Sequence, residues 1–545
     1  MIRSIKAFAI IFIIFSISGC RKENVDTKQN DVKNDETYAP STVKAILDAE
    51  ERLFIGYFDA GADNTSGLCK NNYKNSSTLT SGASGMGIMN LIAGVEHGWI
   101  SRDHAVSQIL KMEHFLQKAD RFGTAWSHWY NSDGSTRAFG EQTAAGDIVE
   151  TSFIIASLLV ASEYFSGDND SEKELRSIAE QFWNELDWTR FVHNGRIHWI
   201  WHSNKTGDDA WSNPLTGWNE SLIACILALA APEGHNITPE IFHKWQTSNS
   251  KFSNPKRVVN GYSLPMGSRD YGGPLFISQY TFLWLDPRDM QDKYGYYWTQ
   301  VVGHAMINRH YCVYEAPAEY QYSEFDWGLT SCQGTDENSA YDTRQPTNDD
   351  GVIGITAAMT SFPFTPFYST QVLLNLAYNY RNLNSTYGFY GAYRPASKAI
   401  STTYLGMEHA PMVPAIENYR SELFWNLAKK NKYFKKGLEL AGISSPAHSE
   451  GFYLAIPESV SGLYDMMRHP DRGNYEIDFY SSSPGKGELS LLDSTGKVVY
   501  NTSINLSSGA NRISFFDESV LRAKPYGLSI TTPGGKYYSL PVCLR

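Results

Sequence analysis

Cysteine is scarce in this sequence, and its spacing excludes the usual cysteine-dependent sites. Only six of the 545 residues are cysteine, and no group of them has the spacing of zinc ligands. A Cys312–Cys332 bridge is one possible pairing, whereas Cys225 lies in an apolar segment and is expected to be a core residue. We therefore expect neither a disulfide framework nor a metal site, and no pattern indicates a cofactor.

Positive charge is limited as well. The formal net charge is −11, and no basic run follows the first few residues. This balance argues against a nucleic-acid partner. The sequence also lacks a Gly-x-Ser-x-Gly nucleophile elbow, a phosphate-binding loop and a dinucleotide fingerprint after a strand. Serine-hydrolase and nucleotide-dependent chemistry are therefore poor fits.

No apolar run is long enough to cross a membrane comfortably, and the longest lies at the N-terminus. "MIRSIK" supplies positive charge, "AFAIIFIIFSI" is apolar, and "ISGC" ends at Cys20. This arrangement resembles a bacterial lipobox, so residues 1–20 are predicted to be a lipoprotein signal peptide with Cys20 lipidated. An ordinary signal peptide or a short anchor is the alternative. Residues 21–41 are polar and aperiodic, which predicts a flexible tether. We expect a cell-envelope protein, at the outer membrane or facing the periplasm, that touches the membrane through its lipid alone.

Residues 42–440 alternate between two kinds of predicted helix. Amphipathic segments, typical of an outer shell, occupy 42–58, 102–119, 172–186 and 366–381. Segments that follow a glycine and are apolar nearly all round occupy 84–95, 146–161, 217–231, 272–285, 351–362 and 406–419. About six buried helices, each with an amphipathic neighbour, predict an (α/α)6 barrel. A helical solenoid is the alternative, but no fixed repeat length is visible, and the long loops at 186–213 and 316–350 favour the barrel.

Carboxylates stand at the heads of several apolar helices. Asp147 and Glu150 begin "GDIVETSF", Glu220 lies in "GWNE", and Glu408 lies in "GMEHA". If inner and outer helices alternate in direction, all inner N-termini open at one end of the barrel, where their partial positive charge favours carboxylates. Each acid alone is equally well explained as a cap or an ion-pair partner. Together they predict a carboxylate-lined mouth.

Aromatic side chains make up 14% of the chain and cluster near these acids. The candidates for contact with a sugar ring are Trp126, His128, Trp129, Trp201 and Trp218. Ordinary core packing is an equally good explanation for any single ring. Paired carboxylates beside aromatic surfaces suit glycosidic cleavage, in which one carboxyl donates a proton and the other activates water or attacks carbon. The acidic segment 334–351 fits no calcium-loop spacing, so a solvated lid is the preferred interpretation.

Five ordered blocks resemble the bacterial glucoamylase-like family, which includes endo-β-1,2-glucanases. They are "GDIVETSF", "GWNES", "YGGPLFISQYTFLWLD", "NDDGVIGITAAMTSFPFTP" and "GMEHAPMVPAIENYRSELFW", and the resemblance covers roughly residues 42–437. It implies an (α/α)6 barrel with a glycan cleft and acids on the inner helices.

Position by position, the resemblance implies site roles for Asp147, Glu150 and Glu220, and it places Asp349 and Asp350 in an "N-D-G" block. The last block departs from the family pattern: Glu408 and His409 stand where an Asp and a Gln are expected. Both changes bear on linkage specificity. Glu417 lies about two turns further on, which indicates a structural role, with Arg420 as its partner.

Beyond about residue 450 the periodicity changes to two. Short alternating stretches are separated by turns such as "STGK" and "TPGGK". About seven short strands in residues 450–545 predict a small immunoglobulin-like β-sandwich. Since it holds no acidic or tryptophan cluster, a structural role is preferred to a second binding site.

The sequence therefore predicts a lipid-anchored glycoside hydrolase that cleaves a poly- or oligosaccharide of the β-glucan class, with endo action on β-1,2-glucan as the favoured reaction. Glu150 and Glu220 are the main acid/base candidates, with Asp147 and Glu408 as further members of the catalytic group. The alternatives are an exo-acting glucoamylase-like hydrolase and a non-catalytic surface glycan-binding lipoprotein, the latter favoured by the altered "MEHAP" block. A polysaccharide lyase is the least favoured, because the mouth is acidic.

Overall fold

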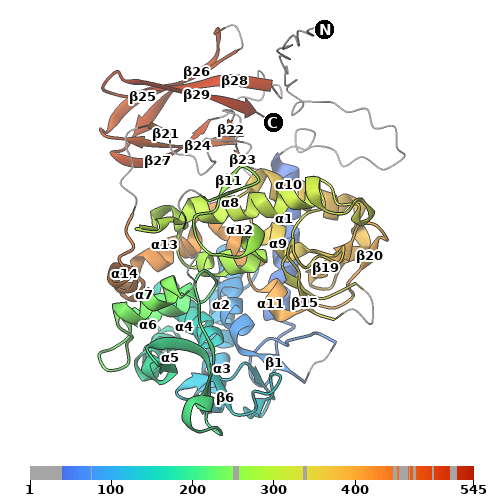
Figure 1. Ribbon diagram of the computed structural model, residues 1–545, viewed down its shortest axis with the longest axis vertical. Helices are drawn as coiled ribbons and strands as arrows, with labels where there is room; N and C mark the ends of the chain where they lie inside the picture. Colours follow the sequence, from blue (N-terminus) through green and yellow to red (C-terminus); the bar gives the residue numbers. More distant parts are fainter. Residues whose placement is uncertain are drawn as a thin grey trace, which may run out of the picture.

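The computed structural model describes most of the chain beyond the N-terminal segment. The described residues are 40–445, with gaps at 75–76, 249–253, 255–256 and 336–339, followed by 451–452, 464–465, 467–469, 474–493, 496–515 and 524–544. A helical body is followed by a region of β-strands at one end of the molecule (Figure 1). Among these residues, no helix has both the length and the apolar character that a membrane span requires. The predicted signal peptide, Cys20 and most of the predicted tether lie outside the described residues.

Amphipathic and buried helices alternate along the body. The partly exposed helices are α1 (Pro40–Phe58), α3 (Arg102–Lys118), α5 (Asp170–Glu185), α7 (Pro239–Thr247) and α10 (Pro366–Asn379). Between them lie the buried helices α2 (Ser81–Glu96), α4 (Ile148–Tyr164), α6 (Leu222–Ala230), α9 (Ile355–Thr360), α11 (Gly406–His409) and α12 (Met412–Ser421). Two further helices, α13 (Leu423–Lys430) and α14 (Lys432–Leu440), end the body.

Helices α2 and α4 pack closely because α2 is rich in small residues. A side chain added at Gly85 would lie 2.6 Å from the backbone nitrogen of Ile154, so glycine at this position lets the two backbones approach. Helix α2 also reaches the last buried segment, since the Asn90 amide donates to the carbonyl of Ala410 over 2.9 Å. Contacts of α12 with both α2 and α9 connect the first buried helix to the last. This helix-rich body is consistent with a barrel of helices.

Two predicted buried segments are not single α-helices. Residues 272–285 form two 3-10 turns, Leu275–Ser278 (η6) and Tyr280–Leu283 (η7). The cause lies upstream, because Gly272 and Gly273 have positive φ and Pro274 follows them, so a regular helical turn cannot start there. The segment 406–419 divides into α11 and α12, with Pro411 at the junction.

Helix α8 (Tyr297–His310) was not predicted from the sequence, although nearly all of it is buried. Polar residues interrupt its apolar pattern, and two of them, Gln300 and Asn308, hydrogen-bond to other segments. Gln300 bonds both the backbone N–H and the carbonyl of Met266, and Asn308 bonds both backbone groups of Leu329. Tertiary hydrogen bonds, which no local pattern reveals, thus allow this polar helix to be buried.

Short strands carry the loops at one end of the body. Strand β6 (Ala145–Asp147) leads directly into α4 and pairs antiparallel with β8 (Arg196–His202), so that Asp147 lies opposite Ile200. Strand β1 (Leu79–Thr80) leads into α2 and pairs with β4 (Trp129–Tyr130). These pairs fix the first turns of the two buried helices.

The C-terminal strands form two sheets. One has the order β21-β24-β23 with β27 beside β24, and the other has the order β22-β29-β28-β25-β26. The strand bounds are β21 (Gly451–Phe452), β22 (Tyr464–Asp465), β23 (Met467–His469), β24 (Asn474–Ser481), β25 (Gly485–Leu492), β26 (Val498–Leu506), β27 (Gly509–Phe515), β28 (Lys524–Thr531) and β29 (Tyr537–Leu544). Apolar residues of both sheets, including Phe479 and Leu528, form one buried cluster. An immunoglobulin-like topology stays a prediction.

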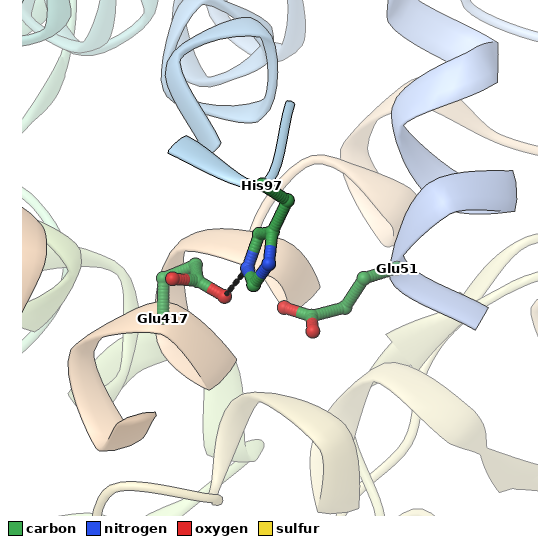
Figure 2. Close-up of side chains that lie close together, drawn as sticks. All are labelled: Glu51, His97 and Glu417. Carbon is green, nitrogen blue, oxygen red and sulfur yellow. Dashed lines mark hydrogen bonds and ion pairs between the residues drawn. The ribbon is translucent and has the colours of Figure 1, made fainter. Parts of the chain in front are cut away.

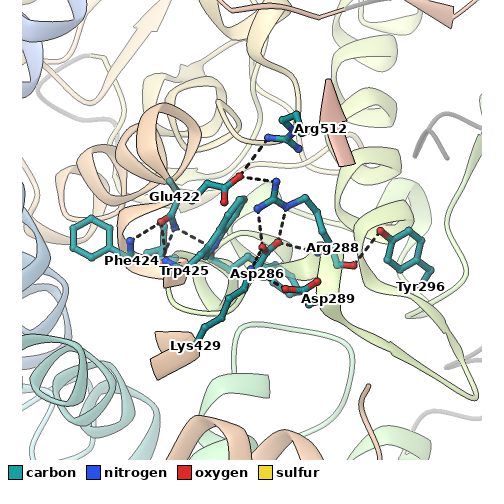
Figure 3. Close-up of polar contacts among 12 residues, drawn as sticks. Asp286, Arg288, Asp289, Tyr296, Glu422, Phe424, Trp425, Lys429 and Arg512 are labelled. Carbon is teal, nitrogen blue, oxygen red and sulfur yellow. Dashed lines mark hydrogen bonds and ion pairs between the residues drawn. The ribbon is translucent and has the colours of Figure 1, made fainter. Parts of the chain in front are cut away.

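An ionic network links the two regions (Figure 3). Asp286 is buried and accepts hydrogen bonds from Arg288 and Lys429, and Arg288 also donates to Glu422 over 2.8 Å. Glu422 in turn lies 3.7 Å from Arg512 on β27. The inner part of this network is buried, whereas its contact with the β region is a longer, half-exposed ion pair.

Four cysteines of the helical body form no disulfide. Cys69, Cys225, Cys312 and Cys332 are all buried and free, so the possible Cys312–Cys332 bridge is not formed. Cys225 is a core residue of α6, as predicted.

Candidate active site

Three glutamates from different buried segments converge on one tyrosine. Burial, followed by the charges of Tyr341, Glu220, Glu408 and Glu150, raises the pKa of Tyr280 well above its ordinary value. Tyr280 lies in η7 and donates its hydroxyl to the carbonyl of Met407, the residue before Glu408. Glu150, Glu220 and Glu408 thus all act on the pKa of Tyr280, which is consistent with the predicted meeting of these helix-head acids; their catalytic roles stay a prediction.

Glu150 is held at the start of α2. Its Oε2 accepts the backbone N–H of Gly82 over 2.8 Å, and only 4% of the residue is exposed. A side chain at Gly82 would lie 2.2 Å from this oxygen, so the approach requires glycine. The pKa of Glu150 is raised to about 7, chiefly by burial; His128 and the Gly82 N–H lower it, and the neighbouring Asp147 and Glu220 raise it.

Glu220 stands just before α6 with one oxygen unpartnered. Its backbone carbonyl accepts the hydroxyl of Thr281, next to Tyr280. The Oε2 atom is buried and meets no hydrogen-bond donor within the described part of the chain. Burial raises the pKa of Glu220 to about 7, Asp147 adds to this, and Arg269 opposes it. The backbone N–H of Glu220 itself also lowers the pKa, but the buried oxygen without a donor favours the protonated form of this carboxyl.

Glu408 is the most deeply buried of the three. It is 1% exposed, and its Oε1 accepts the backbone N–H of Gln333 over 2.5 Å. Its Oε2 is buried without a partner among the residues described, and a side chain at Gly391 would collide with it. Burial raises the pKa of Glu408 to about 8 against the opposing effects of Gln333 and Arg344. Glu408 is therefore protonated at neutral pH.

Asp147 acts first as the cap of α4. Its Oδ1 accepts the backbone N–H groups of Val149 and Glu150 at 3.0 and 2.9 Å. The same atom accepts the indole N–H of Trp199 over 2.8 Å, and Oδ2 lies 2.7 Å from His128 Nδ1. With both oxygens engaged, Asp147 positions its neighbours and has no free oxygen for proton transfer.

His128 lies near both this cap and the carboxyl group of Glu150. Burial lowers its pKa, but Glu150 and Asp147 outweigh that effect, so the net shift is upward. The ring stacks on Phe139 with centroids 3.8 Å apart, and Trp129 lies edge-on to both rings. Trp129 and Trp199 are half-buried. His128 and Trp129 therefore lie at the site as predicted, together with Trp199 and Phe139, which were not selected.

The other three tryptophan candidates lie in different surroundings. Trp126 is 1% exposed, and its N–H donates to the carbonyl of Leu116, so it is a core residue and the prediction of sugar contact is wrong. Trp218 is 6% exposed and packs against Phe282 and Tyr297. Trp201 is half-buried on β8, with the Arg190 guanidinium 5.6 Å from its ring centroid.

His409 is also a structural residue. Its side chain is fully buried, with Nδ1 3.1 Å from the carbonyl of Leu405 and Nε2 2.9 Å from that of Phe389. Burial lowers its pKa to about 4. The prediction that His409 binds substrate is therefore wrong, and of the two changes in "MEHAP" only Glu408 reaches the site.

Asp349 and Asp350 hold the loop before α9. Asp349 accepts the hydroxyls of Tyr311 and Tyr322 at 3.2 and 2.7 Å. Asp350 forms a two-pronged pair with the buried Arg344 at 2.7 and 3.0 Å. Arg344 is itself near Glu408 and lowers the pKa of that carboxyl. The two aspartates thus support the site through this loop, and their predicted contact with substrate stays a prediction.

Sequence reasoning missed the tyrosines of the site. Tyr280 lies within the block "YGGPLFISQYTFLWLD", where the apolar pattern predicted a regular helix. The 3-10 turn η7 that places its side chain at the site was not predicted. Tyr341 belongs to the segment predicted to be a lid; 49% of it is exposed, yet it contributes to the upward shift of the Tyr280 pKa. No metal-binding group is found at this mouth among the described residues.

This arrangement has the components of acid/base catalysis. Glu150 has a donor that stabilises its charged form, whereas Glu220 and Glu408 each keep a buried oxygen without a donor. Carboxyls with pKa values near neutrality can both give and take a proton at physiological pH. Glycosidic cleavage needs one protonated and one ionised carboxyl at the scissile bond.

Known proteins resemble this chain in fold and in sequence. A family model described as "Putative glucoamylase" matches residues 212–432. An exo β-1,2-glucooligosaccharide sophorohydrolase (non-reducing end) of Parabacteroides distasonis is 34% identical over 446 residues, which are 76% of this chain and 61% of that protein. The structure of an endo-β-1,2-glucanase from Chitinophaga pinensis with sophorotriose and glucose matches with a TM-score of 0.70 and 35% identity, covering 74% of this chain and 99% of that one.

A more distant structure shows the fold alone. An endo-β-1,2-glucanase of Talaromyces funiculosus in complex with sophorose matches with a TM-score of 0.56 and 12% identity, over 75% of this chain and 92% of that one.

Proposed function

Because the chain belongs to the glucoamylase-like family of glycoside hydrolases, we propose that it cleaves β-1,2-linked glucan by carboxylate acid/base catalysis. The observation that carries the proposal is the convergence of Glu150, Glu220 and Glu408 on Tyr280, with pKa values of about 7, 7 and 8 for the three glutamates. A glycan-binding protein has no need of three buried carboxyls whose pKa values lie near the working pH.

We assign Glu220 as the general acid and Glu150 as the ionised partner. The Gly82 N–H and the neighbouring His128 stabilise negative charge on Glu150, whereas the buried Oε2 of Glu220 meets no donor within the described chain. Glu408, protonated at neutral pH, donates a hydrogen bond to a sugar hydroxyl in this scheme.

We favour endo action over exo action. The endo-acting relative is 35% identical to this chain along 99% of its structure. The test is incubation with linear β-1,2-glucan, β-1,3-glucan and starch, following reducing ends and product sizes. A ladder of oligosaccharides from the β-1,2 polymer is expected, with rapid shortening of the polymer. Disaccharide alone from the first minutes would support the exo reaction, and no product from any glycan would contradict the proposal.

Two finer points of architecture and location belong to the same proposal. The six buried segments close as the inner ring of an (α/α)6 barrel, which the α12–α2 contact supports. The protein is anchored in the cell envelope by a lipid on Cys20, which the "ISGC" sequence supports. Radiolabelled palmitate should enter the full-length protein and not Cys20→Ser; equal labelling of both would contradict the anchor.

A further inference from the structure

A second group of ionisable residues lies away from the mouth. Glu51 of α1, His97 at the C-terminal end of α2 and Glu417 of α12 offer one ligand atom each, and all three atoms lie within 4.8 Å of one another. Figure 2 shows the His97 ring between the two carboxyl groups. His97 is 15 positions beyond Gly82, which places this group about 20 Å along α2 from the Glu150 contact at 1.5 Å per residue.

The group contains an unsatisfied oxygen. Glu51 is fully buried; its Oε2 accepts a hydrogen bond from Arg420, and its Oε1 meets no hydrogen-bond partner among the described residues. The Arg420 contact fixes the orientation of Glu51, as an outer partner fixes a metal ligand. Glu417 is 3% exposed, and its Oε1 lies 2.8 Å from His97 Nε2.

The charges do not balance without a cation or a proton. Among the residues that the structure describes, Arg420 is the one guanidinium that contacts both glutamates, at 3.7 Å from Glu417, and it also pairs with Asp48 over 2.6 Å. Asp48 has a second cationic partner, Lys44, at 2.6 Å, so two permanent positive charges face three carboxylates. Burying an uncompensated carboxylate is costly.

We propose that Glu51, His97 and Glu417 bind one divalent transition-metal ion, with Zn²⁺ as the best fit. One imidazole and two carboxylates match zinc and its neighbours better than Ca²⁺ or Mg²⁺, which prefer all-oxygen ligand sets. The His97 side chain is 20% exposed, which gives water access to a fourth position. The ion joins α1, α2 and α12 far from the catalytic carboxyls, so its role is structural.

The test is titration of chelator-treated, tag-free protein with ZnCl₂ by isothermal calorimetry. The proposal expects one site per chain, and a melting temperature that rises with Zn²⁺ concentration. His97→Asn and Glu417→Gln should each weaken binding by at least about 100-fold, more than the 10–100-fold typical of losing an outer partner. Hydrolysis of glycan by these variants should be unchanged.

The matched control is His104→Asn. His104 pairs with Asp59 over 2.6 Å, so it is also a histidine beside a carboxylate. It belongs to no candidate metal-binding group of three residues within the described chain. This variant should bind Zn²⁺ like the wild type. Co²⁺ absorption of the wild type provides a readout that needs no variant, because imidazole–carboxylate ligation gives visible ligand-field bands. No saturable Zn²⁺ site in the wild type, or full binding in both ligand variants, would overturn the proposal.

Discussion

At the residue scale, burial of Glu408 makes stability depend on pH. Its pKa of about 8 in the folded state lies above the ordinary value of 4.5, so the folded state holds this proton more tightly. That stabilisation is complete below about pH 4.5 and is lost as the pH rises through 8. Above pH 8 the protein must keep a buried charge.

Glu408→Gln removes this charge, so we expect a higher free energy of unfolding than wild type at pH 9. At about 1.4 kcal/mol per pKa unit, the gain should be a few kcal/mol, and it should shrink toward zero near pH 4.5. Urea unfolding at pH 5, 7 and 9 measures this difference. The control is Glu439→Gln on the exposed face of α14, which should show no such trend. A gain of Glu408→Gln over wild type that is no larger at pH 9 than at pH 5 would contradict the assignment.

The sequence predicted residues whose role is local and missed those displayed by tertiary structure. Asp147 and Glu150 were found because helix heads attract carboxylates, and Glu417 pairs with Arg420 one turn away as predicted. His409 was misplaced because adjacent helical residues point in different directions: Glu408 reaches the site while His409 enters the core. Trp126 was misplaced for a similar reason, since residue type alone does not distinguish a core indole from an exposed one.

At the element scale, the first turn of α2 determines where Glu150 lies. Alanine at Gly82 favours the helix by about 1 kcal/mol, but its Cβ would lie 2.2 Å from Glu150 Oε2. We expect Gly82→Ala to lower kcat/KM at least about 10-fold, since a displaced catalytic group costs orders of magnitude, with little change in melting temperature.

Gly56→Ala on α1 is the matched control, because its added carbon would meet only Tyr387 at an ordinary 3.5 Å. Kinetics and thermal melts on both variants make the comparison. Wild-type activity in Gly82→Ala would show that the Gly82–Glu150 contact is not needed for catalysis.

The elements themselves were predicted where the apolar pattern was uniform. Helices α2 and α4 are buried almost throughout and were found from sequence. The pattern failed at 272–285, where Gly-Gly-Pro prevents a regular start, and at α8, whose buried polar residues are satisfied by distant backbone groups. Both failures arise from information that lies outside the segment.

At the scale of the whole molecule, the network around Asp286 contains a strong contact within the helical body and a weak contact to the β region. Asp286 is buried, and burial raises its pKa. Arg288 and Lys429 outweigh this effect, so the net pKa of Asp286 lies below its ordinary value. Its stabilisation is therefore present above pH 3.8 and is lost at lower pH. The Glu422–Arg512 pair to the β region is partly exposed and 3.7 Å long.

We expect Asp286→Asn to lower the free energy of unfolding by about 3–5 kcal/mol, because it leaves the buried Arg288 without its main counter-charge. Arg512→Ala should cost at most about 1 kcal/mol and leave hydrolysis unchanged. Denaturant unfolding of both variants at pH 7 measures the two costs. A larger loss for Arg512→Ala than for Asp286→Asn would show that the β region stabilises the helical body through this pair.

The central claim is that Glu220 donates the proton to the leaving sugar oxygen while Glu150 is ionised. The most direct measurement compares Glu220→Gln with wild type on linear β-1,2-glucan and on an aryl β-1,2-glucobioside, whose phenolate leaves without protonation. A general acid contributes about 10²–10⁴-fold, so the variant should lose that factor on the glucan and far less on the aryl substrate. An equal loss on both substrates, or none on the glucan, would contradict the account.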